Sequence, residues 1–329
     1  MNERTQLGTT GPAVFPIALG CMGMSPGVYG AAPEEKDGIA TIQIAIERGV
    51  TLIDTGDFYS MGHNEMLVRK AIEGRRDQVQ LSVKFGAMRD PAGAFLGVDA
   101  RPAAIHNFVA YSLKRLGTDH IDIYRPARVD PNVPIEETIG ALADLVKKGY
   151  VRHIALSEVG ADTIRRAAKV HPIVDLQIEY ALVSRAPEEK IFPVLKELGI
   201  SATLYGVLSR GLLSGSKPTG AGDMRGHLPR FASDHQDRNG AVVEAVRKFA
   251  ADRRQTPAQL CVAWALAKEP GFVPTIGART RAQIEGVLAA LDKPLSAAEV
   301  AALEKLVPQD AVAGTRYPAA MMAHLDSER

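Results

Sequence analysis

Three residues at the ends of two short apolar runs have the types needed to deliver a proton. The run 50–54 ends on Asp54 and leads at once to Tyr59, and the run 81–84 ends on Lys84. An ammonium group can lower the pKa of a nearby phenol, and a carboxylate can hold that ammonium in place. A tyrosine tuned in this way can protonate a carbonyl oxygen as a hydride reaches the carbon. In a catalytic trio Tyr59 would be the general acid, with Lys84 lowering its pKa and Asp54 orienting Lys84. The alternative is a structural salt bridge with a nearby surface tyrosine, and a lone trio would favour that alternative.

The elements that would position these residues alternate regularly along the chain. Strand-like apolar runs end near Gly20, Asp54, Lys84, Tyr124, Ser157, Gln177, Tyr205 and Ile276. Helical patterns separate them, for example at 36–48, 102–116, 135–148 and 161–170. Buried strands that alternate with helices favour a parallel sheet, and eight such units favour closure into an α/β fold of the (β/α)8 TIM barrel type. In such a barrel the C-terminal strand ends carry the chemistry.

Four segments lie outside this alternation. Residues 5–14 predict a small N-terminal β-hairpin, which we expect to plug the bottom of the barrel. Long loops are expected at 86–101 and 214–237, both on the C-terminal face, where long loops tend to be functional. The tail 308–329 has no strong period and is expected to fold over the same face. No linker indicates a second domain, so residues 1–329 are predicted to form one barrel domain.

Composition excludes several classes of function. Apolar residues make up 46% of the 329 residues, enough for a large core, and the net charge is +1. This charge, without basic clusters interleaved with aromatics, indicates neither a nucleic-acid nor a membrane partner. Cys21 and Cys261 lack metal-ligand spacing and are typical of reduced thiols. With no signal peptide and no apolar run that could span a bilayer, we expect a cytoplasmic protein that acts on a small molecule. The sequence does not fix its oligomeric state.

Short motifs follow one another in a fixed order over nearly the whole chain. They are 18–25, Asp54 with Tyr59, the helix start 62–65, and the segments 156–158, 177–180, 205–213 and 276–279. In this order and spacing the motifs resemble those of the aldo-keto reductase family. The resemblance implies a TIM barrel that uses NADPH to reduce aldehydes or ketones, and the absence of a Gly-x-Gly-x-x-Gly motif excludes a Rossmann-type cofactor site.

The resemblance also implies which residues bind NADPH. They are Gly23, Met24, Asp54, Ser157, Gln177, Tyr205, Leu208, Arg210, Gly277, Arg279 and Gln283. Ser157 and Gln177 would bind the nicotinamide carboxamide, and Tyr205 would stack on the ring. Arg210, in the loop that contains Leu208, would contact the pyrophosphate. The helix that follows Gly277 would present backbone amides to phosphate, with Arg279 on the 2′-phosphate and Gln283 on the adenine.

The chain departs from the family pattern at three places. Ala127 stands where a histidine is usual, Glu158 where an asparagine is common, and Gly286-Val287 where Glu-Asn often follows. None of the eight histidines is an evident replacement, since His120 and His153 fall near strand starts. A bulkier substrate, a water, Arg125 or Arg128 could fill the space beside Ala127. The predicted substrate pocket comprises Met24, Tyr59, Arg125, Ala127 and Arg128.

The predicted site residues leave three functions open. The leading hypothesis is reversible, NADPH-dependent reduction of an aldehyde or ketone, with Ala127 favouring bulky ketones. The alternative is an NADPH-binding regulatory subunit with little turnover, against which the presence of Asp54, Tyr59 and Lys84 argues. A divalent-metal barrel hydrolase fits worst, because the strand ends lack a His-x-His motif or a carboxylate cluster. No metal site is predicted.

Overall fold

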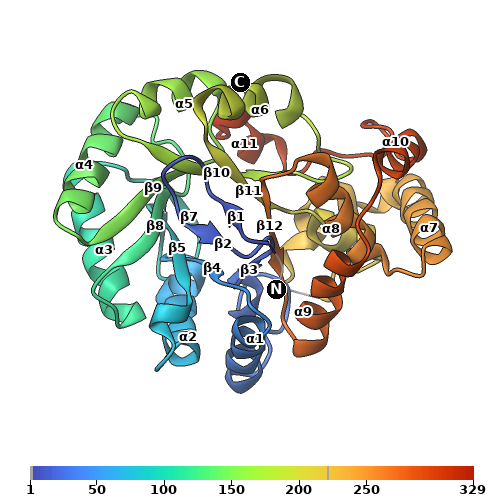
Figure 1. Cartoon of the computed structure of the whole chain (residues 1–329), viewed down its shortest axis with the longest axis horizontal. Coiled ribbons are helices and arrows are strands. Elements are labelled where there is room, and N and C mark those ends of the chain that lie inside the picture. Colours follow the sequence, from blue (N-terminus) through green and yellow to red (C-terminus); the bar gives the residue numbers. More distant parts are fainter. Residues whose placement is uncertain (1–2, 221) are drawn as a thin grey trace.

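Eight parallel strands close into a barrel in the computed structural model, which describes residues 3–220 and 222–329 (Figure 1). They are β3 (Ala18–Gly20), β4 (Leu52–Gly56), β5 (Gln80–Phe85), β8 (Ile121–Pro126), β9 (Val151–Ser157), β10 (Ile173–Glu179), β11 (Ser201–Tyr205) and β12 (Val273–Gly277). Each strand pairs with the next along the chain, and β12 pairs with β3. The predicted TIM barrel is therefore confirmed, and every predicted strand end lies within two residues of the observed one.

Helices surround the barrel and cover its strands. They are α1 (Glu35–Glu47), α2 (His63–Ala71), α3 (Pro102–Leu116), α4 (Ile135–Lys147), α5 (Ala161–Ala168), α6 (Pro187–Leu198), α7 (Gln236–Asp252), α8 (Pro257–Lys268), α9 (Arg281–Leu288), α10 (Ala297–Leu306) and the short α11 (Ala319–Met322). In α4, Ile139, Leu142 and Leu145 lie on one face and are buried. No helix in the described residues is long and apolar enough to cross a membrane.

The N-terminal hairpin closes one end of the barrel, as the sequence predicted. Strands β1 (Thr5–Gln6) and β2 (Ala13–Val14) pair antiparallel. Leu7, between them, packs in a cluster with Val14 of β2 and with residues of the barrel strands: Ala18, Leu52, Ile123, Ala155, Val174 and Val273. Figure 1 shows the hairpin in front of the barrel opening. This apolar plug leaves the opposite, C-terminal end for chemistry.

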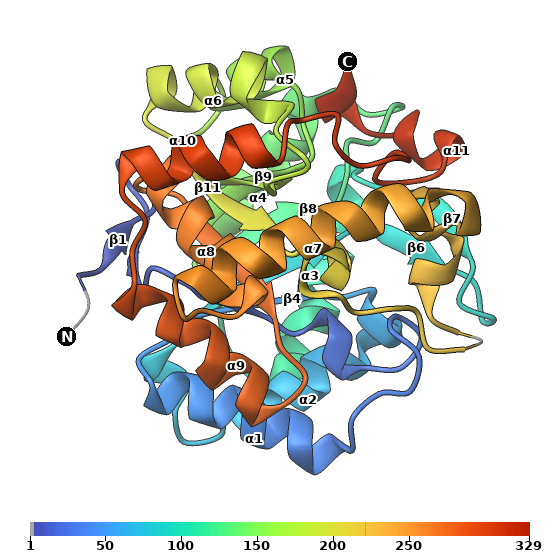
Figure 2. The ribbon, with the colours of Figure 1, turned by 90° about the vertical axis from the view of Figure 1, so that its right-hand side faces the viewer.

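The C-terminal face carries long loops, and two of them contain structure that the sequence did not predict. Within 86–101, β6 (Ala87–Arg89) and β7 (Phe95–Val98) form a hairpin whose turn is closed by a bond of 2.8 Å from the Ala94 amide to Asp90 Oδ1. The segment 214–237 contains short 3₁₀ turns, with Ala221 outside the described residues. Figure 2 shows β6, β7 and α11 at the end opposite β1, so the tail lies over this face as expected.

Candidate active site

Asp54 and Lys84 form a buried ion pair between neighbouring strands of the barrel. Lys84 Nζ lies 2.5 Å from Asp54 Oδ1, and both side chains are almost fully shielded from solvent. The register of β4 and β5 places Gly56 opposite Lys84, so Tyr59 follows only a few residues beyond this level. Lys84 Nζ lies 5.2 Å from the centre of the Tyr59 ring. The structure thus brings together the three residues predicted to be catalytic.

The charge environment of Tyr59 differs from the expected one. Burial of the phenol and the negative charge of Asp54 raise the pKa of Tyr59 well above its usual value, although part of the residue remains exposed. The cation that opposes this rise most strongly is Arg128. Burial lowers the pKa of Lys84, while Asp54 works in the opposite direction. Tyr59 therefore carries its proton at neutral pH, as a proton donor must.

Arg125 lies inside the barrel, so its predicted place in the substrate pocket is wrong. Its guanidinium is fully buried, and Nη1 donates to Asp175 Oδ2 at 2.9 Å and to Thr203 Oγ1 at 3.1 Å. Nη2 donates at 2.9 Å to Ser82 Oγ, which donates in turn to Asp54 Oδ2 at 2.9 Å. A buried guanidinium needs such partners. Arg125 therefore belongs to a polar layer beneath the Asp54–Lys84 pair.

Ala127 and Arg128 lie directly beyond β8, next to the end of β5. The Ala127 amide donates to the Phe85 carbonyl at 2.8 Å, and Ala127 is buried. Arg128 is half-buried, and its Nη1 donates to the Ala127 carbonyl at 2.6 Å. No ion pair of Arg128 occurs within residues 3–220 and 222–329. Of the two arginines considered for the space beside Ala127, only Arg128 remains available to contact a substrate there.

The residues predicted to bind the nicotinamide end lie at the ends of β9, β10 and β11. Ser157 and Gln177 are buried and paired in register. Gln177 Nε2 donates to Asp54 Oδ2 at 2.9 Å, which joins this group to the catalytic residues. Tyr205 is half-buried and donates from its hydroxyl to Glu158 Oε1 at 2.7 Å. These placements agree with a cofactor that lies across the strand ends.

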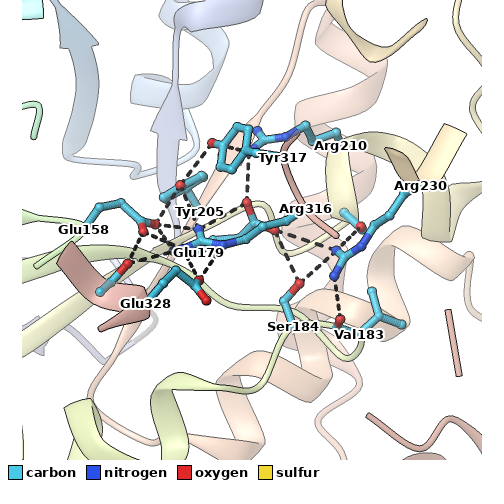
Figure 3. A network of polar contacts seen from close by, with 12 residues as sticks. Glu158, Glu179, Val183, Ser184, Tyr205, Arg210, Arg230, Arg316, Tyr317 and Glu328 are labelled. Atoms are coloured by element: carbon cyan, nitrogen blue, oxygen red, sulfur yellow. Dashed lines mark hydrogen bonds and ion pairs between the residues drawn. The ribbon is translucent and has the colours of Figure 1, made fainter. Parts of the chain in front are cut away.

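Arg210, predicted to contact the pyrophosphate, takes part in a network of charged side chains shown in Figure 3. Its Nη2 donates to Glu179 Oε2 at 2.9 Å and also bonds to the hydroxyl of Tyr317. Leu208, which precedes the turn at 209–214, is half-buried.

Sequence reasoning missed Glu179, Arg316 and Tyr317 as members of this site. Glu179 lies two residues beyond the predicted strand end at Gln177 and could have been found, whereas the tail carries no periodic signal.

A second group of predicted cofactor residues gathers where β12 (ending at Gly277) meets α9. An added Cβ on Gly23 would lie 3.1 Å from the Tyr29 ring and 3.5 Å from the Arg279 side chain, so glycine allows this close approach. Arg279 Nη1 donates to the Tyr29 carbonyl at 3.1 Å, and the Arg279 amide donates to Gln283 Oε1 at 2.7 Å. Met24, next to Gly23, is buried.

Arg279 is a candidate anion-binding residue. Its Nε is buried and has no hydrogen-bond partner among the described residues. The start of α9 follows immediately, with the Thr280 side chain accepting from the Gln283 amide. A guanidinium with a free N–H beside a helix N-terminus suits a phosphate group.

Backbone strain is concentrated around the same strand ends. Six non-glycine residues in the described part of the chain have positive φ, and five of them lie on the C-terminal face: Ser60, Met61, Glu158, Ser209 and Arg210. Such conformations cost roughly 1–3 kcal/mol each and cluster at functional sites. Their positions after β4, β9 and β11 support the assignment of the site to this face.

Cavities and metal ligands do not point to a different site. A cavity of about 480 Å³ lies at the other end of the barrel, between Arg76, His120 and Asp122. Arg76 and Asp122 form an ion pair there, but no tyrosine is among the described residues that line this cavity, so we do not place the chemistry there. Within residues 3–220 and 222–329, no group of His, Cys, Asp and Glu could hold a metal ion.

Comparisons with known proteins agree with this geometry. The model of the aldo/keto reductase family matches residues 16–308. A probable aldo-keto reductase 1 from Glycine max is 38% identical over 321 residues, which cover 96% of this chain and 92% of that protein. The glycerol dehydrogenase of Gluconobacter oxydans superposes with a TM-score of 0.83 at 25% identity, covering 99% of this chain and 98% of that one. An aldo/keto reductase from Klebsiella pneumoniae, solved in complex with NADP and acetate, gives 0.74 at 28% identity, covering 96% and 99%. Because these matches span nearly the whole barrel, the chain belongs to the aldo/keto reductase family of oxidoreductases.

Proposed function

We propose that the protein reduces an aldehyde or ketone to an alcohol with NADPH, and that Tyr59 supplies the proton. The observation that carries this proposal is the buried Asp54–Lys84 pair next to a protonated Tyr59 at the strand ends. The relative from Klebsiella pneumoniae was solved with NADP. The relative from Gluconobacter oxydans is a glycerol dehydrogenase, and alcohol oxidation is the same reaction in reverse.

The reaction assigns one role to each residue of the trio. When bound, NADPH supplies a hydride to the carbonyl carbon. Tyr59 donates its proton to the carbonyl oxygen and becomes a phenolate, which the nearby charge of Lys84 stabilises. Asp54 holds Lys84 in place and balances its charge in the buried site. In the oxidative direction Tyr59 accepts the proton from the alcohol.

The residues present fit a dinucleotide. Tyr205 offers an aromatic face for the nicotinamide ring, with Ser157 and Gln177 close by for the carboxamide. Arg210, after Leu208, would meet the pyrophosphate. Arg279, whose Nε has no partner, would meet the 2′-phosphate, with Gly277 and Gln283 at the same helix start. This arginine is the reason for NADPH rather than NADH.

The position of Ala127 supports bulky ketones as substrates. Its methyl group replaces an imidazole beside the end of β5, so a larger substituent can lie next to the carbonyl. We assign the polarisation of the carbonyl oxygen to Arg128, because it forms no ion pair within the described residues and its charge opposes the rise in the pKa of Tyr59. Arg128→Leu should lower kcat for every carbonyl substrate. If Arg128 only shaped the pocket, the variant would instead change the order of kcat/KM among the substrates.

A substrate screen tests the proposal. Purified protein is mixed with NADPH and a panel of small aldehydes and bulky aromatic ketones, and NADPH consumption is followed. The proposal predicts turnover that is lost in Lys84→Met and kept in Lys190→Met, which changes an exposed lysine. NADPH binding without turnover on any carbonyl would instead support a regulatory subunit.

The location of the protein is a related proposal. Cys21 and Cys261 are both free and buried. Unpaired thiols are common where the surroundings are reducing. We therefore propose the cytoplasm, which fractionation of the source cells would test.

A further inference from the structure

The C-terminal tail lies in close contact with the loop that comes after β9. The Gly160 amide donates to Asp326 Oδ2 at 2.8 Å, and the Ser327 amide donates to the Glu158 carbonyl at 3.3 Å. An added Cβ on Gly160 would lie only 2.8 Å from the Asp326 carbonyl oxygen. Glycine is therefore needed for the tail to lie this close to the barrel.

Arg316 of the tail binds Glu158 with both ends of its guanidinium. Nη1 donates to Glu158 Oε1 at 2.9 Å and Nη2 donates to Oε2 at 2.7 Å. Ser327 Oγ also donates to Oε2, at 2.6 Å. Burial alone would raise the pKa of Glu158, but the hydrogen bonds and charge of Arg316 lower it to about 2. Glu158 is thus a fully buried carboxylate whose charge depends on the tail for its compensation.

The same tail residues fix Tyr205. Besides its bond to Glu158, the Tyr205 hydroxyl lies 3.3 Å from that of Tyr317 and accepts from Arg316 Nη1 at 3.4 Å. Tyr317 is itself buried, packed against Leu228 and Leu325. Figure 3 shows Arg316 and Tyr317 on either side of the Tyr205 hydroxyl. The ring predicted to stack on the nicotinamide is therefore held by a segment from the far end of the chain.

We propose that the tail is a working part of the cofactor site: Arg316 neutralises Glu158 and, with Tyr317, positions Tyr205. This inference rests on the proposed function, because it assigns the nicotinamide end of NADPH to Tyr205. Arg316 is a positioning residue, since it acts through Glu158 and Tyr205.

The charge balance of the network gives the physical reason. Within the ion-paired network, Arg210, Arg230 and Arg316 face Glu158, Glu179 and Glu328, and these charges cancel. The charge of Arg128 also acts on Glu158, but less strongly than that of Arg316. Without Arg316 the network would become negative at the place where an anionic dinucleotide must bind. Tyr205 would also lose the hydrogen bond that its hydroxyl accepts from Arg316. Both effects oppose cofactor binding, and neither touches the proton donor.

The test compares four variants by NADPH fluorescence titration and steady-state kinetics. Arg316→Ala breaks the pair, and Glu158→Asn removes the buried charge and restores the residue that is common in the family. The third variant combines both changes. Arg238→Ala is the matched control, because Arg238 also ties down the tail, at the Ala311 carbonyl at 2.9 Å, but does not contact Glu158.

Arg316→Ala should raise the Kd and KM for NADPH at least about tenfold. Adding Glu158→Asn should restore the Kd to near that of the wild type, because no charge remains to be neutralised. Arg238→Ala should leave it unchanged. Recovery in the double variant separates charge compensation from simple loss of tail packing, which Glu158→Asn could not repair.

Three results would overturn the proposal: unchanged NADPH affinity in Arg316→Ala, an equal loss in Arg238→Ala, or no recovery in the double variant. If Arg316→Ala does not fold, the double variant decides, because folding and NADPH binding by it support charge compensation and their absence contradicts it. A wild-type protein that binds no NADPH would overturn the proposed function together with this one. If only the tail proposal is wrong, the wild type will bind NADPH normally and the variants will give one of the three results above.

Discussion

Tyr59 keeps its proton because burial and the charge of Asp54 both raise its pKa. The sequence predicted the opposite direction, with Lys84 lowering that pKa. The types and spacing of Asp54, Tyr59 and Lys84 identify the trio, but the degree of burial is decided by the loops and tail that cover the strand ends. The charge of Lys84, 5.2 Å from the centre of the ring, favours the phenolate, but burial and Asp54 outweigh it.

Arg279 is expected to select NADPH over NADH. Its free Nε and its place at the start of α9 suit the 2′-phosphate, and a charge-assisted contact contributes about 1.5–3 kcal/mol. Arg279→Ala should weaken NADPH binding roughly 10–100-fold and leave NADH binding nearly unchanged. Titrations of the wild type and of Arg279→Ala with NADPH and with NADH measure this difference. An equal loss for the two cofactors would remove the 2′-phosphate assignment.

Ala127 is expected to set the size of the accepted substrate. Ala127→His would restore a hydrogen-bond donor beside the carbonyl oxygen and take up space next to β5. Small aldehydes should keep or gain kcat/KM, while bulky ketones should lose about tenfold, equivalent to about 1.4 kcal/mol. The useful quantity is the ratio between the two substrate classes. Parallel changes in both classes would mean that Ala127 does not control pocket size.

Among the elements, strands and long helices were predictable, and the covering segments were not. Apolar runs locate β4 and β5 because buried parallel strands need them. Arg125 was placed wrongly because a position near a strand end does not tell whether the side chain points inward to Asp175 or upward to a substrate. The pairing of Arg316 with Glu158 joins residues 158 positions apart, and nothing local in the tail encodes it.

The N-terminal hairpin is expected to contribute stability without affecting catalysis. Leu7 is fully buried in the plug at the end of the barrel opposite Tyr59. Leu7→Ala should lower the free energy of unfolding by about 2–5 kcal/mol, because it leaves a cavity among the barrel strands. Denaturant unfolding measures the loss, with the exposed Leu306→Ala as control. A fall in kcat at a temperature where the variant is fully folded would contradict this, because it would show that the hairpin end of the barrel also affects catalysis.

At the scale of the whole molecule, Asp57 should make stability depend on pH. Burial, and then the charge of Glu65, raise its pKa from 3.8 to about 7. The folded protein therefore binds a proton more tightly than the unfolded chain does. The stability that this proton contributes is fully present below pH 3.8 and is lost as the pH rises through 7.

Asp57→Asn is expected to remove this dependence. A difference of one in pKa corresponds to about 1.4 kcal/mol, so the variant should exceed the wild type by roughly 2–4 kcal/mol in free energy of unfolding at pH 8. Denaturant unfolding at several pH values measures the difference, with the exposed Asp234→Asn as control. Parallel pH curves for the wild type and Asp57→Asn would show that Asp57 does not hold a proton in the folded state.

The central claim is that Tyr59 delivers the proton in a carbonyl reduction driven by NADPH. The most direct measurement compares kcat and NADPH affinity in the wild type and in Tyr59→Phe, using the best substrate from the carbonyl screen. The account predicts a loss of about 10²–10⁴-fold in kcat, typical for removal of a general acid, with NADPH affinity close to that of the wild type. Retention of most of the wild-type kcat by Tyr59→Phe would contradict it, because the proton would then come from another group.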